Sequence, residues 1–72
     1  MLQESEKRIL ELLDERHLLT KGELARIATK ENLDALDVVL SRLQGRGWVD
    51  KVENMGNYIV ITKAGIRALK GE

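Results

Sequence analysis

The stretch from Thr20 to Leu43 carries the clearest alternation of apolar and polar positions in the chain, and it predicts two helices joined by a polar turn. Thr20 and Glu23 have the spacing of a capping box, in which the hydroxyl accepts from the Glu23 backbone N–H and the carboxylate reaches back. We therefore expect a helix over residues 20–29. Its apolar side consists of Leu24, Ile27 and Ala28.

The following helix is expected over residues 33–45, with Asn32 as its N-cap and Asp34 near its positive end. Its apolar stripe repeats at helical spacing and contains Leu33, Leu36, Val39, Leu40 and Leu43. The glycines at 45 and 47 should end it. Two helices joined by a short turn are the core of a helix-turn-helix.

Residues 1–17 predict a first helix with Ser5 as its cap, followed by Leu18–Leu19 as a link to the next helix. One broad face contains Leu2, Ile9, Leu12, Leu13 and Arg16, with Leu10 and His17 at its edge. The remaining positions should be solvated: Glu4, Glu6, Lys7, Arg8, Glu11, Asp14 and Glu15. A stripe wider than one packing seam leaves two interpretations, a helix wedged between two elements or a helix that faces a partner chain.

The period changes after Gly47, where residues 48–52 and 58–62 are rich in β-branched and aromatic side chains. The five residues between them include Gly and Asn, so the segment predicts a β-hairpin. Ile59 and Ile61 are expected to point inward, with Tyr58 and Val60 on the other face. Thr62 should then cap a helix over residues 63–70 that buries Ile66 and Leu69 and ends at Gly71.

Two short motifs add a family resemblance to this order of three helices, two strands and a last helix. Residues 43–49, Leu-Gln-Gly-Arg-Gly-Trp-Val, and residues 61–65, Ile-Thr-Lys-Ala-Gly, stand where a hairpin would begin and end. With these motifs the chain from Thr20 to Leu69 resembles the winged helix-turn-helix transcription regulators, the MarR-like and ArsR-like groups especially. The expected fold is mainly α with a small β-hairpin: one domain over residues 1–72, with the helix-turn-helix at 20–46, the wing at 48–62 and the last helix at 63–70.

The resemblance implies that the third helix enters the major groove of DNA and that the wing reaches the backbone or minor groove. By position, the groove-facing residues would be Asp34, Ala35, Asp37, Val38, Ser41 and Arg42. The wing would contribute Lys51, Asn54 and Asn57, and the region around the second helix would contribute Lys21, Arg26 and Lys30. We expect modest, salt-sensitive binding led by Lys21, Lys30, Arg42, Arg46 and Lys51.

Charge complicates this expectation, because twelve basic residues balance twelve acidic ones and DNA-binding proteins usually carry a basic surplus. Between Leu33 and Tyr58, three basic residues face four acidic ones. Asp34 and Asp37 have two interpretations: acceptors for the cytosine amino group, or stabilisers of the first helical turn. The basic surplus lies in the last helix, at Lys63, Arg67 and Lys70.

Two classes of function therefore stay open. The first is a DNA-binding regulator that acts on double-stranded DNA as a homodimer, paired through the first or the last helix. The second is a protein-docking module without DNA binding, with Val38, Met55 and Tyr58 as contact residues. Trp48 has two interpretations as well, a core residue packed on the third helix or a stacking platform.

Other classes find no support in the residues. The chain has no Cys and a single His, so we expect no disulfide and no metal site. The glycines show no nucleotide-binding pattern, so we expect no cofactor. No Ser or Thr has a His or acidic residue at a spacing that indicates nucleophilic catalysis, so we expect no enzymatic activity. No apolar run reaches about 20 residues, and we expect a cytoplasmic protein that does not act at a membrane.

Overall fold

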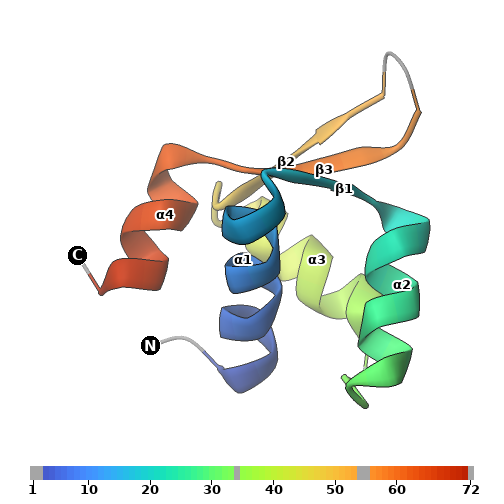
Figure 1. Cartoon of the computed structure of the whole chain (residues 1–72). Coiled ribbons are helices and arrows are strands. Elements are labelled where there is room, and N and C mark those ends of the chain that lie inside the picture. Colours follow the sequence, from blue (N-terminus) through green and yellow to red (C-terminus); the bar gives the residue numbers. More distant parts are fainter. Residues whose placement is uncertain (1–2, 34, 54–55, 72) are drawn as a thin grey trace.

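The computed structural model describes residues 3–33, 35–53 and 56–71, and these form a mainly helical fold with a small antiparallel sheet (Figure 1). The elements follow in the order α1 (Glu4–Arg16), β1 (Leu18–Thr20), α2 (Lys21–Lys30), α3 (Leu36–Gly45), β2 (Val49–Val52), β3 (Tyr58–Ile61) and α4 (Lys63–Lys70). Within the described ranges, no helix has the length and apolar character needed to cross a bilayer.

The sheet has the strand order β1-β3-β2 with both pairs antiparallel, and all the helices lie on one side of it (Figure 1). The hairpin was expected, but β1 was not. Leu18 and Leu19, expected to be a link, pair instead with Val60 and Ile59. A three-residue strand is too short to show periodicity, and its partner lies some forty residues away, so its formation depends on tertiary contacts.

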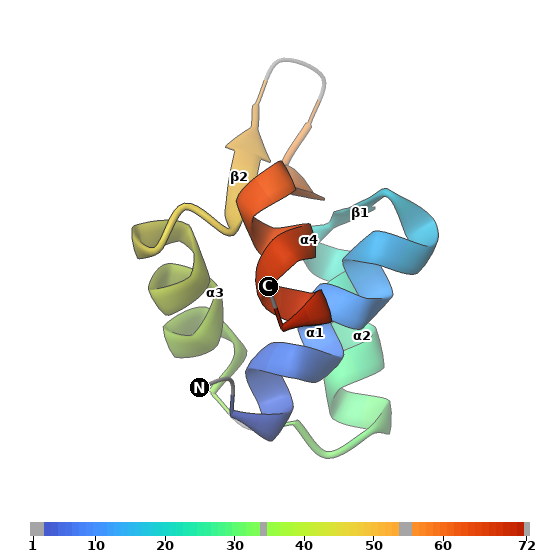
Figure 2. The ribbon, with the colours of Figure 1, turned by 90° about the vertical axis from the view of Figure 1, so that its left-hand side faces the viewer.

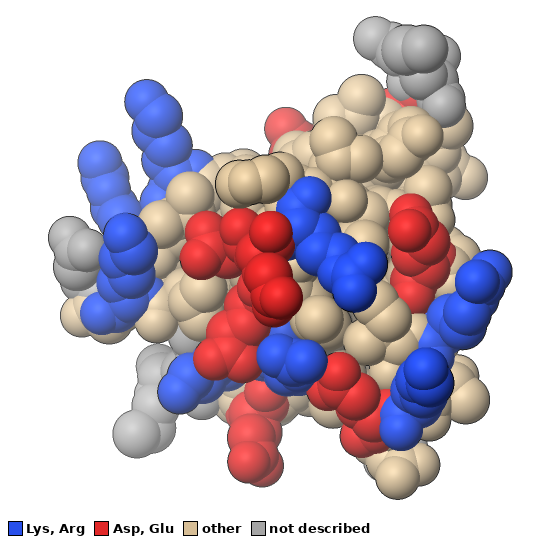
Figure 3. All heavy atoms as spheres, in the orientation of Figure 1, with Lys and Arg blue, Asp and Glu red and all other residues tan. Residues whose placement is uncertain are grey.

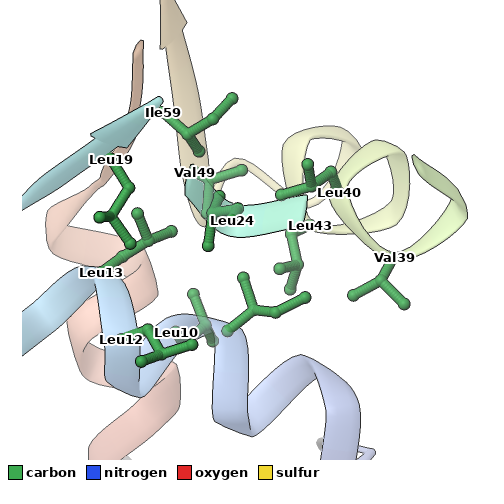
Figure 4. Packing of buried hydrophobic residues seen from close by; sticks show 11 residues of the cluster. Leu10, Leu12, Leu13, Leu19, Leu24, Val39, Leu40, Leu43, Val49 and Ile59 are labelled. Atoms are coloured by element: carbon green, nitrogen blue, oxygen red, sulfur yellow. The ribbon is translucent and has the colours of Figure 1, made fainter. Parts of the chain in front are cut away.

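The core lies between the sheet and the helices (Figure 4). The sheet contributes Leu19, Val49 and Ile59, and the helices contribute Ile9, Leu10, Leu12, Leu13, Leu24, Val39, Leu40 and Leu43. Views from two directions place α1 between α4 and α2 (Figures 1 and 2), and α1 also contacts α3, β1 and β3. The broad apolar face of α1 is therefore wedged between elements of its own chain, the first of the two interpretations.

The N-terminal end of α1 differs from expectation. Gln3 rather than Ser5 is the N-cap, and it forms a capping box with Glu6. Glu6 was expected to be solvated, yet it is only 1% exposed. Its Oε1 accepts from the Gln3 backbone N–H at 3.0 Å, while Oε2 has no hydrogen-bond partner among the described residues. The positive end of the helix offsets part of the cost of burying this carboxylate.

The corner between α2 and α3 corrects a second expectation, because Asn32 ends α2 instead of starting α3. Asn32 has φ 57°, its N–H donates to the Thr29 carbonyl and the Leu33 N–H donates to the Ala28 carbonyl at 2.8 Å. This pair of bonds is a Schellman motif, in which Asn tolerates the left-handed conformation. The third helix begins only at Leu36, after Ala35 with φ 54°, and Asp34 lies outside the described residues.

The last helix agrees with expectation in both ends and caps. The Thr62 hydroxyl accepts from the Gly65 N–H, and Gly71 ends α4 in the left-handed conformation. Ile61 and Leu69 pack against the core as partly buried residues, and so does Trp48. The helix-to-hairpin junction at Gly47 has φ 76°, a conformation that favours glycine.

Candidate nucleic-acid interface

A hollow lies where the first turn of α2, the exposed side of α3 and the inner face of the hairpin meet. Its lining residues are Lys21, Asp37, Leu40, Ser41, Gln44, Lys51 and Ile59. Three residues expected to contact DNA, Lys21, Ser41 and Lys51, are thus brought together from three separate elements. This hollow is called the α3 face below.

A helix cap, a backbone hydrogen bond and strand pairing hold these elements in place. The Thr20 hydroxyl accepts from the Glu23 N–H, so the predicted capping box is present and starts α2 at Lys21. The Lys21 backbone N–H donates to the Asn57 carbonyl at 3.1 Å, which fastens the α2 N-terminus to the hairpin. Lys51 lies opposite Ile59 in the sheet and so on its inner face, the side that meets α3.

Asp37, in the first turn of α3, is the acidic residue among those that line the α3 face. Its Oδ1 lies 2.8 Å from Lys21 Nζ, and the Asp37 side chain is 78% exposed. The hydrogen bond from Lys21, followed by the charges of Lys21 and Lys51, lowers the pKa of the Asp37 carboxyl below its ordinary value. The α3 face therefore presents two ammonium groups and one carboxylate.

Helical spacing decides which side chains of α3 point outward. Val38 and Ser41 lie one turn apart on the exposed side, and both line a shallow hollow with Asp37 and Arg42. Val38 is 54% exposed. Arg42 lies on the flank toward α1, where its Nη1 donates to Gln3 Oε1 at 3.2 Å. The outward line of α3 is therefore uncharged, with its charges on the two flanks.

Gln44 belongs to the α3 face but was not among the expected contacts. Asp37, Ser41 and Gln44 follow the helical spacing i, i+4 and i+7, and all three line the hollow. That spacing was visible in the sequence and could have identified Gln44. A Gln side chain offers the donor and acceptor pair that matches adenine in the major groove.

The remaining expected contacts lie apart from this hollow. The Arg46 guanidinium carbon is 5.0 Å from the centre of the Trp48 ring, a cation–π contact at the end of α3. Trp48 thus packs on the core and also stacks with a cation. Arg26 and Lys30 are exposed on α2 but do not line the hollow. Asn57 contributes its backbone carbonyl, and Asn54 lies outside the described residues.

The residues expected to serve docking do not form one surface. Tyr58 lies opposite Thr20 and Val52, on the outer face of the sheet, whereas Val38 lies on α3 beneath the inner face. Leu18 and Val52 on the outer face are 48% and 40% exposed, with Val60 half-buried beside Leu18. Met55 lies outside the described residues. This set of Leu18, Val52, Tyr58 and Val60 is called the outer sheet face below.

Charge elsewhere is mixed, as Figure 3 shows for the side that carries α1. Positive side chains gather over α4, where Lys63, Arg67 and Lys70 are exposed. Arg8 donates two hydrogen bonds to Glu31, 2.7 and 2.9 Å long, and ties α1 to the end of α2. Among the described residues, no cluster of three or more His, Cys, Asp or Glu side chains could hold a metal ion.

Comparisons of this chain with protein-family models, with curated proteins and with solved structures gave no match.

Proposed function

We propose that this chain is a winged helix-turn-helix domain that binds double-stranded DNA through α3, the hairpin and the first turn of α2. The order of elements supports the fold assignment, as does the strand order β1-β3-β2. The two sequence motifs behind the resemblance also touch each other, because the Thr62 hydroxyl donates to the Gly47 carbonyl at 2.6 Å. That contact holds the hairpin's two ends together.

The observation that carries the proposal is the convergence of Lys21, Ser41, Gln44 and Lys51 from three elements onto one exposed hollow beside α3. Lys21 and Lys51 both line the hollow beside α3, and their ammonium groups suit contacts with phosphates. Ser41 and Gln44 carry hydrogen-bonding groups suited to base edges. The carboxylate of Asp37 offsets part of the positive charge, so affinity for DNA should be modest and fall with salt.

The binding unit that we propose is a homodimer in which two copies of α3 reach successive major grooves. The apolar side chains of α1 are buried within their own chain, so α1 offers no apolar face for pairing. On α4, Ile66, Ala68 and Leu69 are only partly buried. Pairing through α4 is therefore favoured over pairing through α1. Sedimentation velocity of wild type and Ile66→Glu tests this: a dimer lost in the variant supports α4, and a wild-type monomer contradicts pairing.

The test of DNA binding compares two double variants with the same change in charge. Lys21→Ala/Lys51→Ala alters the α3 face, and Lys63→Ala/Lys70→Ala alters α4. Binding to a labelled random-sequence duplex is measured by fluorescence anisotropy over a range of salt concentrations. We expect the first pair to weaken binding and to reduce the salt slope by the amount expected for about one phosphate contact, that of Lys51, because Lys21 is paired with Asp37. The α4 pair should have a smaller effect.

Two outcomes would contradict this assignment. Larger losses from the α4 pair would move the binding surface to α4, and absence of binding by the wild type at low salt would remove DNA as a generic partner. Circular dichroism of both double variants checks that each one is folded.

A protein-docking function is the second candidate, and the outer sheet face is the observation that favours it. Its exposed Leu18 and Val52 lie on the side of the sheet away from all the helices. If docking is the function, Leu18→Ser/Val52→Ser should abolish retention of a partner protein while the domain stays folded. Lys21→Ala/Lys51→Ala should then leave retention unchanged.

A further inference from the structure

Asp37 has a position that the proposed DNA contact does not explain. It is the acidic residue among those that line the α3 face, and its carboxylate lies 2.8 Å from the Lys21 ammonium. Lys51 lies close enough for its charge to act on the same carboxylate. A surface built only to attract phosphate would not place a negative charge beside its lysines, because that charge repels each phosphate nearby.

A role confined to stabilising the first turn of α3 does not account for this geometry. An acidic side chain that acts only on the helix dipole needs no cationic partner from another element. Here the carboxylate pairs with the first residue of α2, whose backbone is fastened to the hairpin through Asn57. Asp37 therefore decides how much of the Lys21 charge is available to a ligand.

We propose that Asp37 makes the α3 face selective among DNA sequences. Its ion pair with Lys21 keeps that lysine from contacting the phosphates of generic DNA. A DNA site that presents a hydrogen-bond donor to the carboxylate is bound more tightly. This inference rests on the proposed DNA binding. In the major groove, the cytosine amino group is a donor that an Asp side chain accepts from. A backbone phosphate offers only acceptors, so the ion pair between Asp37 and Lys21 persists on generic DNA.

The first test is a titration of Asp37→Asn with a random-sequence duplex over a range of salt concentrations. Removing a carboxylate about 6 Å from phosphate should tighten binding about threefold even with the dielectric constant of water. Lys21 is then free to contact phosphate, so affinity should fall more steeply with salt concentration, by the amount expected for about one additional phosphate contact. Asp14→Asn is the matched control, because it makes the same charge change on the exposed side of α1. The double variant Asp37→Asn/Lys21→Gln should lose the gain.

The second test asks for the base preference. Duplexes with a randomised centre are selected for binding to wild type and to Asp37→Ala, and the bound pools are sequenced. We expect one position enriched in cytosine with the wild type and not enriched with the variant. The same cytosine preference in both pools would overturn the role in recognition.

Failure of this inference is separable from failure of the proposed function. If wild type, Asp37→Asn and Asp14→Asn bind the random duplex equally well, DNA binding stands and the role of Asp37 is overturned. If none of the three binds even at low salt, the proposed function fails and this inference fails with it. Binding by Asp37→Asn alone would support the withholding of Lys21.

Discussion

Gly65 of α4 lies directly against the backbone carbonyl of Trp48 at the start of the hairpin. A Cβ at position 65 would overlap the Trp48 oxygen and stand 2.8 Å from Ile61 Cγ1. Neither the carbonyl nor the turn around it can move away, because the Trp48 oxygen also accepts from the Thr62 N–H at 3.0 Å. This close approach explains in physical terms why the segment Thr62–Gly65 requires glycine at its last position.

Gly65→Ala should therefore destabilise the domain by about 2–3 kcal/mol, since an added methyl group meets backbone atoms. Urea unfolding followed by Trp48 fluorescence measures the change. Gly45→Ala is the control, because nothing lies within 4 Å of a Cβ at position 45 and its φ is not positive. That control should be neutral or stabilise by up to about 1 kcal/mol. Equal stability of both variants would contradict the close approach.

Thr62 joins the two ends of the hairpin by donating to the Gly47 carbonyl while accepting from the Gly65 N–H. Thr62→Val keeps the shape and removes both bonds, and the expected loss is about 1–2 kcal/mol in the free energy of unfolding. Thr62→Ser keeps the hydroxyl and should stay within about 0.5 kcal/mol of wild type. A loss in Thr62→Ser with none in Thr62→Val would mean that the methyl group, and not the hydroxyl, stabilises this turn.

Ala35 holds a left-handed conformation that an L-residue adopts only at a cost of about 1–2 kcal/mol. Ala35→Gly relieves this strain and should stabilise the domain by about 0.5–1 kcal/mol after the greater freedom of glycine in the unfolded chain is counted. Ala25→Gly makes the same change on the exposed side of α2 and should destabilise by about 1 kcal/mol. Thermal or urea unfolding distinguishes the opposite signs, and a loss of stability in both variants would contradict the strain at Ala35.

Glu31 should contribute a pH-dependent part of the stability. The Arg8 guanidinium donates two hydrogen bonds to its carboxylate and so holds the pKa of Glu31 below its ordinary value. The folded chain then binds this proton more weakly than the unfolded chain does. The stabilisation is fully present above the unfolded pKa of about 4.3, and it is lost as the pH falls through the lower folded pKa.

Unfolding of wild type and Glu31→Gln, measured at neutral pH and at about pH 2, tests this sign. The variant should be less stable than wild type at neutral pH, and the difference should shrink at the acidic pH. Arg8→Gln should reproduce the pattern, and adding Arg8→Gln to Glu31→Gln should cost little more. A difference that stays constant with pH would show that the pair does not act through its charge.

Periodicity and capping chemistry alone predicted much of this fold. The capping box at Thr20 and Glu23, the bounds of the last helix and the hairpin partners around Ile59 all follow from local side-chain chemistry. The role of Asn32 could not be predicted from local side-chain chemistry. Its side chain suits both a helix start and a left-handed helix end, and only the position of Leu33 against the core selects the second.

In the candidate site, too, some features follow from the local sequence and others depend on tertiary packing. The sequence by itself identified Lys21, Ser41 and Lys51 as candidate contacts. Helical spacing also places Asp37, Ser41 and Gln44 on one side of α3, although Gln44 was not among the expected contacts. Only the tertiary structure decided that β1 joins the sheet, that Lys21 pairs with Asp37 and that Lys51 faces α3. The physical reason is distance along the chain: these contacts join segments whose mutual position depends on how the whole core packs, which no local propensity encodes.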